Sequence, residues 1–240
     1  MVDADVQPEG AEMIGIISID FETIPNPAAL AMMPDPEVRL GNVKDPAKVA
    51  AKIEEAKAAQ VEKAALDPLT ARIASYAIVG ETGGKRSEYC EVIDAEADDE
   101  GEIKIVQSVM EVLGKPETRI ITFNGVYFDM PMIYRRAMIL GVDPRDFQAP
   151  PLTAWTSRYK TDRHYDIGNL WYGWGPRQKG ENLDRLAAMV LGARKVEFDV
   201  TTIKDLITTD EGRAALEEYN LQDARITYDL WLRGLGVLYS

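Results

Sequence analysis

Apolar and polar positions along the chain predict strands and helices in a definite order. Residues 14–20 (IGIISID) are apolar at both odd and even positions, which is typical of a central strand covered on both faces. Two further runs, 72–80 and 87–94, are joined by a turn at 83–84 and predict a hairpin. The short apolar run at 119–123 predicts a buried strand that pairs in parallel with the first strand after a helical crossover.

Helical patterns lie between and after these strands. Asp45 is a predicted N-cap with Pro46 at the first helical position, and the Ala-, Lys- and Glu-rich run to about Leu66 predicts a long helix. Further helices are expected at 102–113, after the loop at 124–129 as far as Gly141, at 182–192 and from about 211 to 235, with an aromatic and basic connector over 144–180. This order predicts an α/β fold in which helices flank a mixed central β-sheet of about five strands.

The chain is expected to form a single domain over residues 1–240, because 46% of its residues are apolar and its length suits one sizeable core. Residues 24–70, Pro-rich at first and helical afterwards, are expected to be an insertion. That insertion has two readings: a solvated helix, or an arch over a site at the end of the first strand.

The net charge of −13 argues against a protein that coats nucleic acid, because phosphate binding depends on Lys and Arg. It leaves room for an enzyme that grips one strand end at a metal site, where bound cations reverse the local charge. The single cysteine, Cys90, fits a reducing compartment, and the sequence has no signal-peptide pattern and no apolar run of membrane-spanning length. We therefore expect a soluble cytoplasmic protein with no membrane partner, in a bacterium or a phage-infected host.

Carboxylates gather at the ends of the predicted elements. Asp20 and Glu22 share strand parity and point to the same side, and Asp129 follows the end of the strand at 119–123. Tyr219 and Asp223 are four residues apart on the last helix and share one face. We expect the four carboxylates to meet at one sheet edge with no lysine or arginine among them. Mutual repulsion would then be relieved by hard divalent cations such as Mg²⁺ or Mn²⁺.

Three short motifs carry a resemblance to a known family. They are DFE (20–22), NGVYFD (124–129) and YNLQD (219–223), and the segments HYDIGNL (164–170) and NLDRLAAMVLG (182–192) accompany them. The chain resembles, over residues 14–234, the DEDD (DnaQ-like) 3′–5′ exonucleases, and is most similar to predicted exonucleases related to the proofreading domain of family B DNA polymerases. The tyrosine in the third motif places the resemblance in the DEDDy subgroup. It implies an RNase H-like, three-layer fold.

The resemblance also implies residue roles and cofactors. Two divalent cations, Mg²⁺ or Mn²⁺, would be held by the four carboxylates. Asp20 would bridge both cations, Glu22 and Asp223 would complete the site nearer the attacking water, and Asp129 would hold the second cation. Tyr219 would orient that water, since its ordinary pKa of about 10 makes it a poor base at neutral pH.

Substrate contacts are less sharply indicated. Asn124 is a candidate partner of the terminal nucleotide or of the Asp129 loop. Phe128 and Phe21 are candidate stacking residues, although phenylalanine is more often a core residue. For His164 we favour a structural or strand-contacting role over that of a general base, and Arg163 beside it is a further candidate substrate contact. Asp166 is expected to cap the following turn rather than to bind metal.

Basic residues gather in two further places, within 155–179 and at 135–136. The segment 155–179 interleaves aromatic and cationic residues, which suits either a single-strand groove or a loop packed over the core. Arg135 and Arg136, on the helix after Asp129, are candidates to face either phosphate or solvent, and we expect solvent.

The sequence thus predicts a metal-dependent 3′–5′ exonuclease that releases nucleoside 5′-monophosphates from single-stranded DNA 3′ ends by a two-metal-ion mechanism, in proofreading or repair in trans. A 3′–5′ exoribonuclease of the same fold, with RNA as substrate, is one alternative. A non-catalytic module that binds strand ends or a polymerase is another. A replicative DNA polymerase is the candidate protein partner.

Overall fold

The computed structural model describes residues 15–82, 84–94, 99–158, 162–196 and 198–234. A five-stranded mixed sheet forms its centre, in the strand order β3-β2-β1-β4-β5. The strands are β1 (Ile16–Pro25), β2 (Ala71–Thr82), β3 (Lys85–Val92), β4 (Arg119–Thr122) and β5 (His164–Asp166). β1 pairs antiparallel with β2 and parallel with β4, and β2 pairs antiparallel with β3, so the predicted hairpin and the predicted parallel pair are both confirmed.

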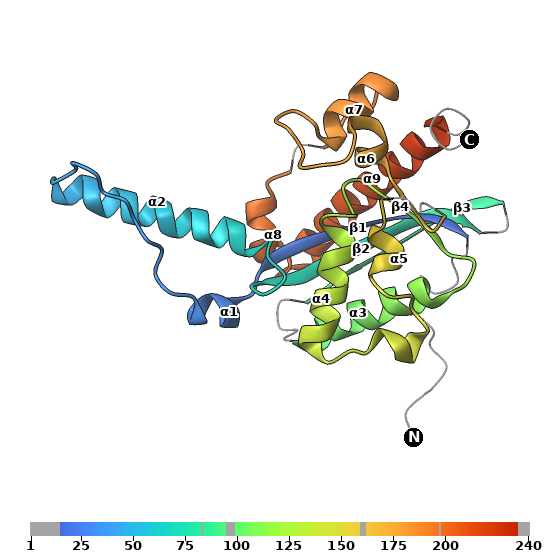
Figure 1. Ribbon diagram of the computed structural model, residues 1–240, viewed down its shortest axis with the longest axis horizontal. Coiled ribbons are helices and arrows are strands. Elements are labelled where there is room, and N and C mark those ends of the chain that lie inside the picture. Colours follow the sequence, from blue (N-terminus) through green and yellow to red (C-terminus); the bar gives the residue numbers. More distant parts are fainter. Residues whose placement is uncertain (1–14, 83, 95–98, 159–161, 197, 235–240) are drawn as a thin grey trace.

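In the described residues, helices lie between and after the strands except within the β2–β3 hairpin (Figure 1). The longer ones are α2 (Pro46–Ala64), α3 (Asp99–Gly114), α4 (Asp129–Leu140), α7 (Leu183–Val190) and α9 (Asp210–Gly234). The shorter ones are α1 (Pro27–Met32), α5 (Thr153–Thr156), α6 (Ile167–Tyr172) and α8 (Ile203–Leu206), with 3-10 turns η2 (Pro144–Phe147) and η3 (Val200–Thr202). None of the helices among the described residues is long and apolar enough to span a membrane.

Apolar layers cover both faces of the sheet. Ile17, Ile19 and Phe21 of β1 pack in the core shared with α3 and α4. On the opposite face, Ala77 and Val79 of β2 pack with residues of α7 and α9. Both faces of the sheet are therefore covered by packed layers, as the sequence predicted for the position of the first strand.

β1 is longer than its sequence indicated. The expected strand ended at Asp20, whereas β1 continues to Pro25, two residues into the range expected for the insertion. Its pairing with β4 ends at Ser18, but the long strand β2 continues to pair beyond that point, from Phe21 opposite Tyr76 to Pro25 opposite Ala71. One irregularity in register falls between Glu22 and Thr23.

The expected connector over 144–180 is not wholly irregular, since it contains the fifth strand. β5 has only three residues and pairs in parallel with β4, placing His164 opposite Ile120 and Asp166 opposite Thr122. It is a mixed polar and aromatic tripeptide, too short to show an alternating pattern.

The expectation that Arg136 faces solvent is wrong. Arg136 is buried in α4 and donates through Nε and Nη2 to the two carboxylate oxygens of buried Glu102 in α3, both at 2.7 Å. Glu102 also accepts a hydrogen bond from the backbone N–H of Ile73 at 3.0 Å. This ion pair joins α3, α4 and β2, and a two-point contact of this kind suits the planar guanidinium.

The helix α2 projects away from the body of the protein, and the chain between α1 and α2 runs out to its far end (Figure 1). Asp45 caps it as predicted, with its carboxylate accepting from the backbone N–H of Ala47 at 2.9 Å. Ala64 is the one buried residue of α2, at the end nearer the sheet.

Candidate active site

The first two carboxylates stand on β1 beyond the end of its parallel partner. Ser18, Asp20 and Glu22 share one face of the strand, opposite the face that carries Ile19 and Phe21. β4 no longer pairs with β1 after Ser18, so this part of β1 has an open edge. Asp20 and Glu22 are partly buried there.

The helix α9 crosses this face and is fixed by hydrogen bonds on either side of Asp223. The Ser18 hydroxyl donates to the backbone carbonyl of Ala224 at 2.7 Å, and the Asn220 side chain donates to the Ser75 hydroxyl at 2.7 Å. All four of these residues are fully buried. The turn that carries Asp223 therefore has a defined register against β1.

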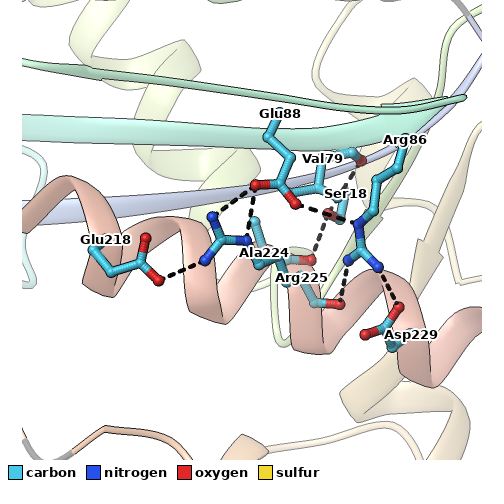
Figure 2. A network of polar contacts seen from close by, with 8 residues as sticks. All are labelled: Ser18, Val79, Arg86, Glu88, Glu218, Ala224, Arg225 and Asp229. Atoms are coloured by element: carbon cyan, nitrogen blue, oxygen red, sulfur yellow. Dashed lines mark hydrogen bonds and ion pairs between the residues drawn. The ribbon is translucent and has the colours of Figure 1, made fainter. Parts of the chain in front are cut away.

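An ion network between β3 and α9 adds to this attachment (Figure 2). Arg225 contacts Glu88 of β3 at 2.7 Å and Glu218 at 2.6 Å, and Arg86 contacts Asp229 at 2.9 Å. The network therefore joins β3 to α9 on both sides of Asp223 in the sequence.

These attachments bring three carboxylates together. One oxygen each from Asp20, Glu22 and Asp223 lies within 4.8 Å of the others, a spacing at which a single cation can contact all three. The predicted meeting of β1 with the last helix is therefore observed in the geometry.

Asp129 reaches the same region from the first turn of α4, where it is buried. The loop before it is held by Asp166, whose carboxylate oxygens accept the backbone N–H groups of Asn124 and Val126, each at 3.0 Å. Asp166 also caps α6, as the sequence suggested. Gly125 has no room for a side chain, because a Cβ there would lie 2.2 Å from the hydroxyl oxygen of Thr122.

The electrostatics of the cluster favour protonated carboxyls when no cation is bound. Burial, followed by the charges of Asp223 and Asp129, raises the pKa of Asp20 well above its ordinary value. Burial and then the charge of Asp223 raise the pKa of Glu22 to about 8, and burial raises that of Asp129 to about 8. The pKa of Asp223 is raised too, chiefly by burial. Ionised carboxylates in this cluster repel one another and are poorly solvated, and a bound cation would reduce both penalties.

A lysine side chain lies among the carboxylates, so the expectation that no lysine or arginine would be present there is wrong. Lys195 forms an ion pair with Asp223 and donates a hydrogen bond to the Tyr219 hydroxyl at 3.2 Å. Lys195 lies in the segment before η3, far from each motif in the sequence. The signal that points to it is physical: four carboxylates in one place require compensating charge.

Tyr219 is fixed by aromatic packing as well as by Lys195. Its ring stacks on that of Phe198 with centroids 4.1 Å apart, and the Lys195 ammonium lies 5.0 Å from its centroid. Burial, with the charges of Glu22 and Asp223, raises the Tyr219 pKa to about 12. The hydroxyl is therefore neutral and can act as a hydrogen-bond donor and acceptor at physiological pH.

The donor set fits a hard divalent cation. The second oxygen of Asp223, Oδ1, is buried and has no hydrogen-bond partner among the described residues. A buried acceptor left without a donor is costly, and metal coordination is one way to satisfy it. Asp20, Glu22 and Asp223 offer only oxygen ligands, which Mg²⁺ and Mn²⁺ prefer.

These residues open into one cavity of about 950 Å³. Of the residues predicted from sequence, its lining includes Asp20, Phe21, Glu22, Asn124, Phe128, Asp129, Tyr219 and Asp223. Phe21 is nonetheless a core residue, almost fully buried beside Tyr76.

His164 and Arg163 are not brought to this cavity. His164 is buried, with one ring nitrogen bonded to the Thr122 hydroxyl at 2.8 Å and the other to the Trp155 carbonyl. Burial lowers its pKa, so the ring is neutral. Arg163 lies over the Trp155 ring, with its guanidinium carbon 6.0 Å from the centroid. These contacts support the structural role for His164.

The aromatic and basic segment 155–179 also contributes to packing. Trp155 is buried and donates to the Tyr134 hydroxyl at 2.7 Å, while Arg177 donates to the carbonyls of Gly168 and Gly173. Trp171 is half exposed. Tyr159 and Lys160, which were part of the same sequence pattern, lie outside the described residues.

Comparison with known proteins identifies the family. The model of a family described as "predicted 3′–5′ exonuclease related to the exonuclease domain of PolB" matches residues 66–237. This range includes Asp129, Tyr219 and Asp223, and β1 with Asp20 and Glu22 precedes it. The chain belongs to this family of predicted exonucleases.

Curated relatives are archaeal proteins named DNA polymerase 1. That of Aeropyrum pernix is 32% identical over 118 residues, which is 46% of this chain and 12% of the relative. That of Sulfolobus acidocaldarius is 28% identical over 138 residues, which is 55% of this chain and 15% of the relative. The chain thus spans only a small part of the length of these polymerases.

A solved structure shows the same fold. The family B DNA polymerase of the archaeon Pyrobaculum calidifontis aligns with 93% of this chain and 25% of its own, with a TM-score of 0.55 and 19% identity. Together with the layered sheet, this confirms the expected three-layer α/β fold of the polymerase-related exonuclease domains.

Proposed function

We propose that this protein is a 3′–5′ exonuclease that uses two divalent cations, Mg²⁺ or Mn²⁺, to release nucleoside 5′-monophosphates from single-stranded DNA 3′ ends. The observation that carries the proposal is the meeting of carboxylates from β1, α4 and α9 in one open cavity. Membership of the exonuclease family supports the reaction, and the polymerase relatives support DNA as the substrate.

The carboxylates divide into two groups in this proposal. Glu22 and Asp223 would hold one cation, Asp129 would hold the other, and Asp20 would contact both. When bound, such a pair of cations activates water and stabilises the charge that develops around phosphorus during in-line displacement. Asp223 Oδ1, which lacks a donor among the described residues, supports its place in this set.

Tyr219 and Lys195 would position the reacting groups. An ammonium group only donates, so the Tyr219 oxygen accepts the Lys195 hydrogen bond and its own O–H is left to donate to a water or a phosphate oxygen. Stacking on Phe198 keeps the Tyr219 ring in one orientation. Lys195 also offsets the Asp223 charge, and it would shift toward phosphate when cations occupy the carboxylates.

The same site is compatible with two alternative functions. An exoribonuclease would use identical carboxylates and differ in its contact with the 2′-hydroxyl. A binding module for strand ends or for a polymerase would not need a complete set of four carboxylates and a tyrosine. Action in trans beside a replicative polymerase is our proposal for the biological setting, prompted by the polymerase relatives.

A labelled-oligonucleotide assay tests the function. A 5′-labelled single-stranded DNA should shorten progressively from its 3′ end in Mn²⁺ or Mg²⁺ and stay intact in chelator, and Asp20→Asn should abolish shortening. Glu54→Gln, an exposed acid on α2, is the control for a lost charge and should behave as wild type. Faster shortening of an RNA of the same sequence would favour the exoribonuclease. No shortening of either strand with either metal would favour the binding module.

A further inference from the structure

One wall of the cavity comes from the helix α2, which precedes the range matched by the exonuclease family. Ala58, Val61, Glu62, Ala65 and Leu66, at or just past the sheet-proximal end of that helix, line the same cavity as the carboxylates. Ala58, Val61 and Glu62 lie along one face of α2, and Ala65 and Leu66 follow in the turn after the helix. Four of the five residues are apolar. Val61 is 40% exposed and Leu66 is 64% exposed, so the apolar groups stand open to the cavity.

This wall is held in place by the same strand that carries the carboxylates. Thr23, the residue after Glu22, donates its hydroxyl hydrogen to the carbonyl of Ala65 at 2.6 Å. The Thr70 hydroxyl donates to the carbonyl of Ala64 at 3.0 Å. The sheet-proximal end of α2 is therefore fixed relative to Glu22, although the far end of the helix projects from the body (Figure 1).

Residues of η3 and α8 also line the cavity. They are Val200, Thr201, Thr202, Lys204 and Asp205, and Val200 is 52% exposed. Phe128 belongs to the same lining. The cavity therefore has exposed apolar groups from two segments, α2 and η3, together with the carboxylates.

The chemistry of the α2 wall suits nucleobases and does not suit phosphates. Among its five residues the one charged group is Glu62, which repels a phosphate backbone. Apolar side chains gain free energy by covering the faces of bases, in proportion to the apolar area removed from water. The cations that attract phosphate, Lys195 and Lys204, stand elsewhere in the lining.

We propose that α2 and the turn that follows it form a substrate-binding element, in which Val61 and Leu66 pack against the nucleobases at the 3′ end of a single strand. This proposal rests on the proposed exonuclease function and adds a binding surface to it. The phosphates at the end would lie toward the carboxylates and Lys195, and the bases would lie toward α2. Binding through this wall depends on the presence of bases and not on their sequence.

The test compares matched double variants and two substrates. Val61→Ser/Leu66→Ser removes the exposed apolar groups of the wall. Met32→Ser/Leu69→Ser removes two apolar groups of the same insertion that are 81% and 71% exposed and do not line the cavity. Each protein is measured for binding of a fluorescein-labelled single-stranded DNA by anisotropy in Ca²⁺, and for cleavage kinetics in Mn²⁺. The same measurements are made on an oligonucleotide whose 3′-terminal nucleotides are abasic.

We expect Val61→Ser/Leu66→Ser to weaken binding of the normal strand by about five- to twentyfold, as follows from losing apolar contacts worth about 1–2 kcal/mol. KM should rise by a similar factor with little change in kcat. Wild type should lose the same factor on the abasic strand, where the wall variant should cause no further loss. Met32→Ser/Leu69→Ser should match wild type on both strands.

The outcomes separate this proposal from the proposed function. If wild type cleaves DNA and Val61→Ser/Leu66→Ser binds DNA as tightly as wild type does, the base-binding wall is overturned and the proposed exonuclease function stands. A penalty that persists undiminished on the abasic strand would also overturn it. Binding without cleavage by wild type would count against the exonuclease, and the abasic comparison would still decide the wall. If the wall variant changes the sedimentation coefficient and not DNA binding, the wall is a self-association surface and the proposal fails.

Discussion

Replacing Asp20 by asparagine should stabilise the metal-free protein while removing its response to metal. The carboxyl of Asp20 is crowded by Glu22 and Asp223, with ligand oxygens within 4.8 Å of one another, and Asp129 adds to the repulsion. An amide has nearly the same shape as a carboxylate and carries no charge. The variant therefore keeps the packing and loses one of the repelling groups.

The size of the effect follows from this geometry. Two unit charges 4.8 Å apart interact by about 3.5 kcal/mol at an effective dielectric constant of about 20. Lys195 offsets part of this repulsion, and partial protonation of the carboxyls relieves another part. A net gain of about 2–3 kcal/mol near pH 8 remains, equivalent to about 4–12 °C in Tm for a protein of this length.

Differential scanning fluorimetry in chelator and in millimolar Mn²⁺ provides the assay. Wild type should have the lower Tm in chelator and should gain stability with Mn²⁺, because a ligand that binds only the folded state stabilises it. Asp20→Asn should have the higher Tm in chelator and should gain little from Mn²⁺. Glu54→Gln, with the same change in net charge, should follow wild type. A Tm for Asp20→Asn equal to or below that of wild type in chelator would refute the repulsion.

Three further predictions concern the same site and the core beside it. Lys195→Met should lower the Tm of the metal-free protein, with a loss of about 1–3 kcal/mol, since it leaves the buried Asp223 without its partner; an unchanged Tm would show that the pair contributes nothing. Metal-free wild type should lose stability as pH rises from about 5 to 8, because the pKa values of Glu22 and Asp129 are raised to about 8 in the folded state. The free energy of unfolding should fall by about 1.4 kcal/mol per pH unit for each proton that the folded state retains and the unfolded state has lost. Denaturant titrations that show stability rising over this range would contradict the prediction. Arg136→Met should destabilise the protein by about 3–5 kcal/mol, because the buried Glu102 carboxylate loses its shortest ion pair and keeps only the longer one to Arg72. Adding Glu102→Gln should recover much of the loss, because it removes the buried charge; additive losses in urea unfolding would argue against a charge effect.

Much of the fold was predictable because strand parity and helix spacing carry the information. β1 and β4 are apolar runs of the buried type. Their parallel pairing follows from the hairpin, which makes β3 parallel to β1, and from the helix α3, which connects β3 to β4. Asp20 and Glu22 share a face because they are two residues apart on a strand, and Tyr219 and Asp223 do so because they are four apart on a helix. Local spacing was sufficient for these features.

The features that escaped prediction depend on contacts between distant segments. β5 is three residues long and is stabilised by pairing with β4, so its sequence alone carries no strand pattern. Lys195 meets Asp223 through the path of the chain before η3, which no motif records. Arg136 did leave a signal, since it lies on the same helix face as the buried residues Met132 and Ile133. A charged residue on an apolar face calls for a buried partner, and Glu102 supplies it.

The central claim is that carboxylates from three separate elements form one cation site, and anomalous diffraction from crystals soaked in Mn²⁺ tests it most directly. The proposed site predicts at least one anomalous peak within bonding distance of Asp20, Glu22 and Asp223, with Lys195 displaced from Asp223, and no such peak in Asp20→Asn crystals. Wild-type crystals with no peak among these carboxylates, and with Asp223 still paired to Lys195, would contradict the claim.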